Sequence, residues 1–222
     1  MSTPDLHLRT LFLLDRDGRI RGTREPDPDP GPFFALIRGR TSCAWAVRAD
    51  LPQDIAEKLA GLAREEPPVA HFRDAPMHAE RYMALAGGEL YFGPAFAFPE
   101  TVEQPDATVI VDDVRLLARH FSGWTDAEIP VRSPVVAVVV DGDAVSVCFC
   151  ARRSDAAAEA GLETAEAFRG RGLGPQAAAG WALAVRASGR IPLYSASWAN
   201  GASLAVARKL GLVVYACGWS LG

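Results

Sequence analysis

The sequence feature that most constrains the fold is a glycine-rich segment at residues 168–175, which reads FRGRGLGP. Three glycines in five residues let the backbone turn sharply and approach a ligand closely. Pro175 suits the first turn of a helix, so we expect the segment to lead from a strand into a helix. The unpaired amides at such a helix start favour an anion, and Arg169 and Arg171 add positive charge. The segment therefore predicts a phosphate-binding loop.

Other nucleotide-binding loops fit this segment less well. A dinucleotide loop needs the spacing GxGxxG and an acidic residue about 20 positions later. Here glycines stand at every second position, and residues 190–194 contain no carboxylate. A Walker loop needs Gly-Lys followed by Ser or Thr, which is absent from the segment. A plain structural turn remains the alternative to phosphate binding.

The composition is that of an ordinary soluble globular protein, with 49% apolar and 23% charged residues in a chain of 222. The formal net charge of -4 argues against a nucleic-acid-binding surface over the whole protein. The first ten residues contain no basic stretch followed by a long apolar run, so we expect no signal peptide. No window approaches the roughly 18 apolar residues of a membrane helix. We therefore expect a cytoplasmic protein that contacts neither nucleic acid nor membrane.

The cysteine pattern predicts no metal site. The four cysteines form no CxxC pair, and no histidine cluster has zinc spacing. Cys148 and Cys150 fall on one face of a predicted strand, where we expect buried thiols in a reducing compartment. A thiol nucleophile is the alternative role for this pair.

The first hundred residues predict an α/β region without a recognisable motif. A helix should begin near residue 50, with Asp50 as its N-cap and Pro52 in its first turn, and end at Pro67. A second, weaker helix is expected over 77–86. The predicted strands cover 8–14, 33–38, 43–48 and 90–98. Residues 99–107 are polar and contain two prolines, so we place a domain boundary here, with one domain over 1–104 and another over 105–222.

The second domain predicts strands that alternate with helices. A β-branched run at 135–140 and a strand at 144–151 are joined by an Asp141-Gly142 hairpin turn. Residues 113–120 read as a short helix. The remaining predicted strands are 160–168, 193–197 and 212–217, and the remaining helices are 175–188 and 202–210. This alternation after a leading hairpin indicates a mixed α/β sheet.

Two motifs in this domain resemble the GNAT superfamily of N-acetyltransferases. Arg169-x-x-Gly172-x-Gly174 matches the family signature Arg/Gln-x-x-Gly-x-Gly/Ala. Residues 198–211, WANGASLAVARKLG, resemble the family's Asn-x-x-(Ser/Ala)…Lys-Leu-Gly-Phe helix, with Leu212 in place of the usual Phe. The resemblance covers roughly 130–222. It implies a mixed, mostly antiparallel sheet flanked by helices, with the first domain as an N-terminal α/β extension.

The resemblance implies acetyl-CoA, or coenzyme A, as the cofactor. Family members hold the pyrophosphate on the loop amides and the pantetheine arm between two parallel strands that splay apart. We expect the first of these strands to be 160–168. Asn200 would cap its helix through the amide of Ser203, and in the family it also lies near the pantetheine. By resemblance the cofactor-binding residues are Thr164, Ala165, Arg169, Gly170, Arg171, Gly172, Leu173, Gly174, Asn200 and Ser203.

Acetyl transfer to an amine needs a group that removes a proton from the amine. Many family members use a glutamate, often through water, and the candidates here are Glu163 and Glu159, with Glu166 as a further one. Ser203 is a candidate for polarising the thioester. The family often has a general-acid tyrosine four residues before the helix-ending glycine, where this chain has Ala207.

The resemblance therefore predicts an N-acetyltransferase, EC 2.3.1.-, that moves an acetyl group from acetyl-CoA to an amine acceptor. Ala207 keeps open a catalytically weak acyl-CoA-binding module or a protein-interaction module of GNAT fold. The N-terminal domain would shape the acceptor pocket or mediate homodimerisation.

Overall fold

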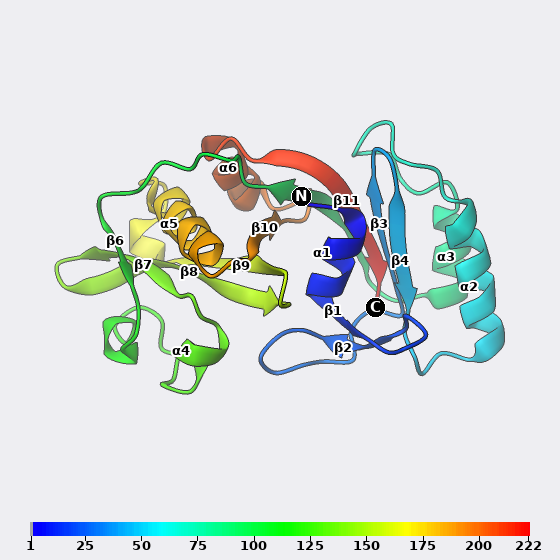
Figure 1. Cartoon of the computed structure of the whole chain (residues 1–222), viewed down its shortest axis with the longest axis horizontal. Helices are drawn as coiled ribbons and strands as arrows, with labels where there is room; N and C mark the ends of the chain where they lie inside the picture. The colour runs from blue at the N-terminus through cyan, green and yellow to red at the C-terminus, as the bar shows by residue number, and fades with distance from the viewer. Residues whose placement is uncertain (1) are drawn as a thin grey trace.

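The structure, a computed structural model, describes residues 2–222 and contains helices on both sides of one large sheet (Figure 1). The α-helices are α1 (Pro4–Leu11), α2 (Gln53–Glu65), α3 (Ala79–Ala86), α4 (Glu128–Val131), α5 (Leu173–Ala187) and α6 (Gly201–Lys209). The strands are β1 (Phe12–Leu14), β2 (Ile20–Thr23), β3 (Phe34–Gly39), β4 (Cys43–Val47), β5 (Leu90–Ala97), β6 (Thr108–Ile110), β7 (Val136–Val140), β8 (Asp143–Arg153), β9 (Ala157–Thr164), β10 (Ile191–Ser195) and β11 (Val213–Leu221). Two short 3-10 helices are η1 (Val114–Leu116) and η2 (Glu166–Phe168).

The large sheet has nine strands in the order β4-β3-β11-β5-β10-β9-β8-β7-β6. All neighbouring strands are antiparallel except β9 and β10, which run parallel. Strands β1 and β2 form a separate hairpin. The prediction of a mixed, mostly antiparallel sheet flanked by helices is confirmed.

Strand β5 lies between β10 and β11, although it precedes both by about a hundred residues in the chain. Its residues pair with β10 from Ala95 to Ala97 and with β11 from Leu90 to Ala97. The predicted domain boundary at residue 104 falls between β5 and β6, and strands from both sides of it join one sheet. The division into two domains stays a prediction.

Side-chain alternation separates two layers over the sheet. On β9, Ala158 packs into the core beneath α5, whereas the neighbouring Glu159 faces His7 on α1. On β3, Leu36 packs against α2 and Ile37 against α1. Helices α2, α3, α5 and α6 therefore cover one face, and α1 covers the middle of the other.

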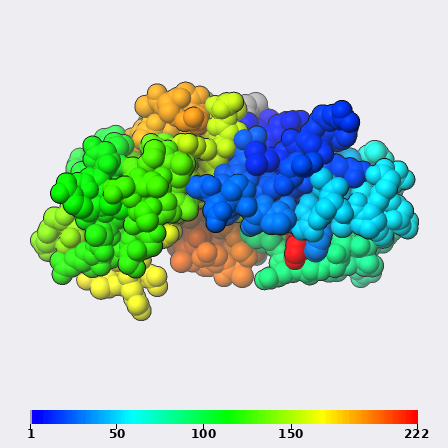
Figure 2. Space-filling view, turned by 90° about the horizontal axis from the view of Figure 1, so that it is seen from below, coloured from blue at the N-terminus to red at the C-terminus, as the bar shows by residue number. Residues whose placement is uncertain are grey.

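The N-terminal segment is an integral part of this second layer. Figure 2 shows it, in blue, filling the space between the green segment that follows β5 and the cyan helices α2 and α3. Leu8 of α1 and Phe12 of β1 are buried in a core shared with β3, β4, β5 and β11. The segment thus places its side chains against the centre of the sheet.

The predicted strand over 8–14 is wrong for its first half, because residues 4–11 form α1. The Thr3 hydroxyl accepts a hydrogen bond from the Leu6 amide, and Pro4 occupies the first helical turn. His7 and Leu8 turn inward, and the strand begins only at Phe12. An apolar run such as LRTLFLL fits either structure, and the N-terminal cap favours the helix.

Three smaller predictions also need correction. Pro52, not Asp50, occupies the N-cap of α2, because the Asp50 carboxylate accepts a hydrogen bond from Arg48. The helix expected over 113–120 is reduced to η1. The strand expected over 160–168 begins earlier, as β9, and ends at Thr164, where η2 follows a turn. In the described residues no helix is long and apolar enough to cross a membrane.

Candidate active site

The loop between β9 and α5 is built around two glycines in the left-handed region. Gly170 has φ 76° and Gly172 has φ 79°, and Gly172 is the N-cap of α5. A Cβ added to either would meet no atom within 4 Å, so open space adjoins both. Because a glycine has no side chain to cap the helix, the first amides of α5 are left for another acceptor. The predicted loop therefore has the backbone of an anion site at a helix start.

Positive charge surrounds this loop. Arg169 donates to the Thr164 carbonyl at 3.2 Å, and Arg171 donates to the Ala167 carbonyl at 3.0 Å. Arg171 also lies over the ring of Phe168. Both guanidinium groups are exposed, and within the described residues neither forms an ion pair with a carboxylate. Their charge is therefore available to a bound anion.

The parallel strands β9 and β10 separate beside this loop. They pair from Ala157 and Ile191 up to Glu159 and Leu193. Beyond this point β9 continues on β8 alone, and β10 continues on β5. The edge of β9 that faces β10 therefore has no strand partner over residues 160–164. This gap opens toward the glycine loop, as expected for strands that splay apart around an extended chain.

The other predicted cofactor residues lie around the gap, and some of their polar groups are already hydrogen-bonded within the protein. Gly174 is buried, and a Cβ added to it would lie in ordinary contact with Leu162 and Thr164. The Thr164 hydroxyl pairs with the Ser146 hydroxyl at 2.8 Å. The Ala165 amide already donates to the Val145 carbonyl, so this amide is occupied. Leu173 packs against the core beneath α5.

Helix α6 begins as the sequence predicted. The Asn200 side chain accepts a hydrogen bond from the Ser203 amide at 3.0 Å and so caps the helix. The Ser203 carbonyl accepts a hydrogen bond from the buried Tyr194 hydroxyl. Ala207 is buried in the core that α6 shares with α5, and Tyr194 belongs to the same core.

The three candidate glutamates lie in different environments. Glu163 and Glu166 are exposed, whereas Glu159 is only 3% exposed. Glu159 ends the paired part of β9, so it lies where the gap begins. The structure therefore brings Glu159, but neither exposed glutamate, into the interior at this point.

Glu159 is the centre of a buried polar network. Its Oε1 accepts a hydrogen bond from the Ser195 hydroxyl and lies 3.4 Å from Nε2 of His7. Its Oε2 accepts a hydrogen bond from Arg152 at 3.2 Å. Nδ1 of His7 in turn meets the Tyr215 hydroxyl.

This network keeps Glu159 ionised. Burial alone would raise the pKa of its carboxyl, but the hydrogen bond and charge of His7, the charge of Arg152 and the Ser195 hydroxyl outweigh burial. Together they lower the pKa of Glu159 to about 2. Arg152 also binds Glu25 from the segment after β2, so the network reaches into the hairpin layer.

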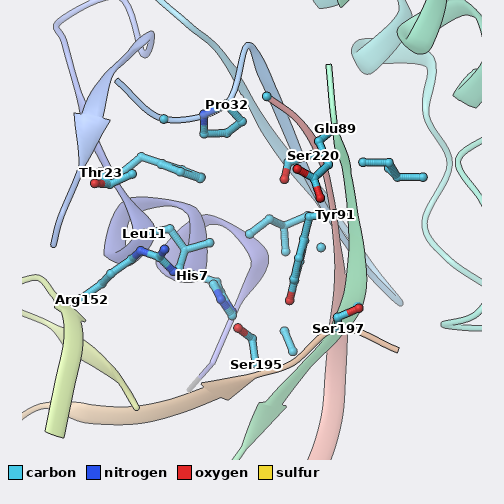
Figure 3. Close-up of a pocket in the computed structure, with 18 of the residues that line it drawn as sticks. His7, Leu11, Thr23, Pro32, Glu89, Tyr91, Arg152, Ser195, Ser197 and Ser220 are labelled. Carbon is cyan, nitrogen blue, oxygen red and sulfur yellow. The ribbon is translucent and has the colours of Figure 1, made fainter. Parts of the chain in front are cut away.

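A cavity of about 760 Å³ lies between the sheet, α1 and the β1–β2 hairpin, and we call it the α1 cavity. One part of its wall is apolar and includes Leu11, Phe12 and Ile37. The polar end, shown in Figure 3, carries His7, Tyr91, Arg152, Ser195 and Ser197. Its volume is that of a site for a small molecule.

The polar end of the α1 cavity adjoins the gap between β9 and β10. Ser195 and Ser197 follow directly after Leu193, the last residue that pairs with β9. Tyr91 of β5 points its hydroxyl toward these two serines (Figure 3). Burial raises the pKa of Tyr91 to about 12, and the charge of Glu159 acts in the same direction. The phenol therefore stays protonated at neutral pH.

Sequence reasoning missed His7, Tyr91, Arg152 and Ser195. None of them belongs to a motif, and they come from α1, β5, β8 and β10. The one local signal was the position of His7 next to Leu8 on the buried face of a short helix. A correct helix assignment for residues 4–11 would have marked this histidine as an interior residue.

The site therefore combines a glycine loop at a helix start with splayed parallel strands and an adjoining cavity. The family model of the GNAT acetyltransferases matches residues 135–216, from β7 into β11. The segment 135–216 thus matches the GNAT family, and the resemblance seen in its loop motif is confirmed for this part of the chain.

Solved structures of GNAT proteins are similar to this chain. A GNAT-family acetyltransferase from Novosphingobium aromaticivorans is 18% identical, over 60% of this chain and 64% of that one, with a TM-score of 0.49. A GCN5-related N-acetyltransferase-like protein from Streptococcus suis is 20% identical over 86% and 85%, with a TM-score of 0.47. A GCN5-related N-acetyltransferase from Sphaerobacter thermophilus is 14% identical over 94% and 78%, with a TM-score of 0.48. This chain thus covers less than two thirds of the Novosphingobium protein. No curated protein matches the sequence.

Proposed function

We propose that this protein is an N-acetyltransferase that moves an acetyl group from acetyl-CoA to a small amine in the α1 cavity. The observation that carries the proposal is the continuity of three parts: the glycine loop, the gap beyond Glu159 and Leu193, and the polar end of the cavity. The match of residues 135–216 to the GNAT acetyltransferase family model supports acyl transfer as the reaction class.

The cofactor would lie along the first two parts. Its pyrophosphate would accept hydrogen bonds from the amides at the start of α5, beside Arg169 and Arg171. The pantetheine amides would pair with the free edge of β9 over residues 160–164, as a strand would. This path ends near Ser195, so the thioester would face the cavity.

The acceptor would approach from the cavity. The apolar wall suits the body of a small organic molecule, and the polar end suits an amino group. The hydroxyls of Tyr91 and Ser195 line this end of the cavity, and Glu159 lies behind Ser195, whose hydroxyl it accepts. This assignment gives the N-terminal hundred residues a role in shaping the acceptor pocket, because α1, the β1–β2 hairpin and β5 all line it. The four cysteines are unpaired, which supports a reducing, cytoplasmic location.

Two measurements test the proposed function. Calorimetry should show CoA and acetyl-CoA binding with a Kd of a few micromolar, on the order of 8 kcal/mol. A thiol-release assay with acetyl-CoA and a library of primary amines should then find an acceptor. Binding without turnover would favour the alternative of an acyl-CoA-binding module. The absence of heat at about 100 μM protein, well above such a Kd, would contradict cofactor binding.

A further inference from the structure

The α1 cavity continues from its polar end to a second end at the start of β5. Figure 3 shows Glu89 and Ser220 at this second end, with Tyr91 between them and Ser195. The backbone of Glu89 pairs with that of Gly222, so Glu89 extends the antiparallel pairing of β5 with β11 by one residue. The sheet therefore fixes the position from which the Glu89 side chain enters the cavity.

A second carboxylate belongs to the same end. Asp29 lines the cavity from the segment after β2, and its carboxylate accepts a hydrogen bond from the Gly31 amide at 2.6 Å. The following Pro32 lies against Gly222, because a Cβ added to this glycine would stand 3.1 Å from the Pro32 Cα. Since Gly222 also pairs with Glu89, the two carboxylates lie at one end of the cavity, which we call the acidic end.

The charges that line the cavity are not balanced. Two arginines also line it, and each is already paired with carboxylates: Arg48 with Asp50, and Arg152 with Glu25 and Glu159. Asp29 and Glu89 form no ion pair within residues 2–222, which the structure describes. A ligand with a positive charge at the acidic end would supply the missing partner.

The distance between the two ends follows from β5. Glu89 stands four residues before Gly93, a span of about 13 Å along an extended strand. Gly93 lies against the backbone of Ala196, which stands between Ser195 and Ser197. The Glu89 side chain covers part of this span, so a chain of roughly six methylene groups, at about 1.5 Å per bond, fills the rest. The apolar wall of the cavity suits such a chain.

We propose that the acceptor is a linear diamine or a longer polyamine, whose second ammonium group binds Glu89 while its first amine faces Ser195 and the thioester. This inference rests on the proposed function and names the substrate class of the same site. Glu89, with Asp29 beside it, is then a specificity-determining residue. It selects the far end of the substrate and takes no part in the transfer.

The transfer itself needs only the near amine. This amine loses one proton to solvent and attacks the acetyl carbonyl as the free base. An N–C bond forms, the C–S bond breaks, and a second amine proton leaves with the CoA sulfur as the thiol. The far ammonium keeps its protons throughout, so the product is a monoacetylated diamine with one positive charge.

The test compares two acceptors that differ only at the far end, hexylamine and hexamethylenediamine, with acetyl-CoA and the full-length protein. We expect the diamine to have a KM about fivefold lower, the effect of an exposed ion pair, after correction for its two equivalent ends. The kcat values should be similar. Glu89→Gln should raise the KM of the diamine to that of hexylamine and leave hexylamine unchanged. High salt should also reduce the difference, because it screens the exposed charge.

A charge reversal makes the test stricter. Glu89→Lys should lose the preference for the diamine and instead favour ε-aminocaproate, whose far end is a carboxylate. Glu80 on α3 offers a matched control, since it is exposed and does not line the cavity. Glu80→Gln should keep the wild-type preference. Because Glu89 is itself exposed, thermal denaturation should show that its variants remain as stable as the wild type.

The outcomes separate this inference from the proposed function. A wild type that acetylates hexylamine as efficiently as the diamine would overturn the inference alone, and so would a preference that survives in Glu89→Gln. A wild type that acetylates no amine would contradict the proposed function. Calorimetry with the two amines in the presence of CoA would then decide the charge selectivity. Diamine binding that Glu89→Gln weakens would support it, and equal binding of the two amines would overturn it.

Discussion

Gly172 has a left-handed backbone conformation and open space around it at the start of α5. A side chain at this position would therefore act in two separate ways, through backbone strain and through its own charge. Any L-residue would be strained at φ 79°, at a cost of about 1–2 kcal/mol. An aspartate would also bring a negative charge to the amides that we assign to the pyrophosphate. Gly172→Asp should therefore weaken CoA binding at least 100-fold, as measured by calorimetry.

Gly189 provides the matched control for this prediction. It has φ 80°, nothing lies within 4 Å of its missing Cβ, and it follows the other end of α5. Gly189→Asp should suffer a comparable loss of thermal stability and yet bind CoA normally. Equal CoA affinity in the two folded variants would place the anion somewhere other than the glycine loop.

At this scale the sequence predicted the loop but not the buried network. The need for glycine is local, since it depends on the φ angles of Gly170 and Gly172 and on the helix that follows. His7 has no comparable local requirement. His7 was not predicted because its partner is Glu159, and the two residues meet only when distant segments of the chain pack together.

Strand β5 packs very closely against the chain that follows β10. Gly93 faces the backbone after β10 so closely that an added Cβ would lie 1.9 Å from the Ala196 carbonyl oxygen. Gly93→Ala should therefore force β5 away from the chain that carries Ser195 and Ser197. We expect a loss of about 2–3 kcal/mol in the free energy of unfolding, measured with urea.

The neighbouring strand offers the comparison. Gly218 of β11 pairs with Gly93, and its added Cβ would lie 3.4 Å from the Tyr91 ring, an ordinary contact. Gly218→Ala should cost much less than Gly93→Ala. If both variants unfold at the same urea concentration, the close approach of β5 to Ala196 is not a constraint on stability.

Prediction of the elements succeeded where their pattern is local. The β-branched run at 135–140 and the Asp141-Gly142 turn specify β7, β8 and the turn between them from adjacent residues alone. It failed at α1, because the apolar run after residue 8 fits a helix as well as a strand. The strand order could not be predicted, because the place of β5 depends on pairings with segments far along the chain.

At the scale of the whole molecule, the Glu159 network ties together α1, β8, β9, β10 and the segment after β2. Folding lowers the carboxyl pKa from its ordinary value near 4.5 to about 2. A lowered pKa stabilises the fold above the unfolded value, and this contribution is lost as the pH falls toward the folded one. It amounts to about 3 kcal/mol at neutral pH.

Urea unfolding at several pH values checks this contribution. The wild type should lose stability between about pH 4.5 and 2 more steeply than Glu159→Gln, which lacks the titrating group. Glu163 on the same strand is exposed, so Glu163→Gln should follow the wild type throughout. A constant difference between wild type and Glu159→Gln across this range would show that the carboxylate charge is not what stabilises the network.

The interior position of β5 also determines how the chain can be divided. A break in the segment between β5 and β6 would give one fragment that ends in a strand without neighbours and another with a vacant place between β10 and β11. Each fragment would hold part of the cavity wall, and only their association would complete the sheet. Two separately expressed halves should therefore associate, and the proposed acetyl transfer would be restored only when both are present.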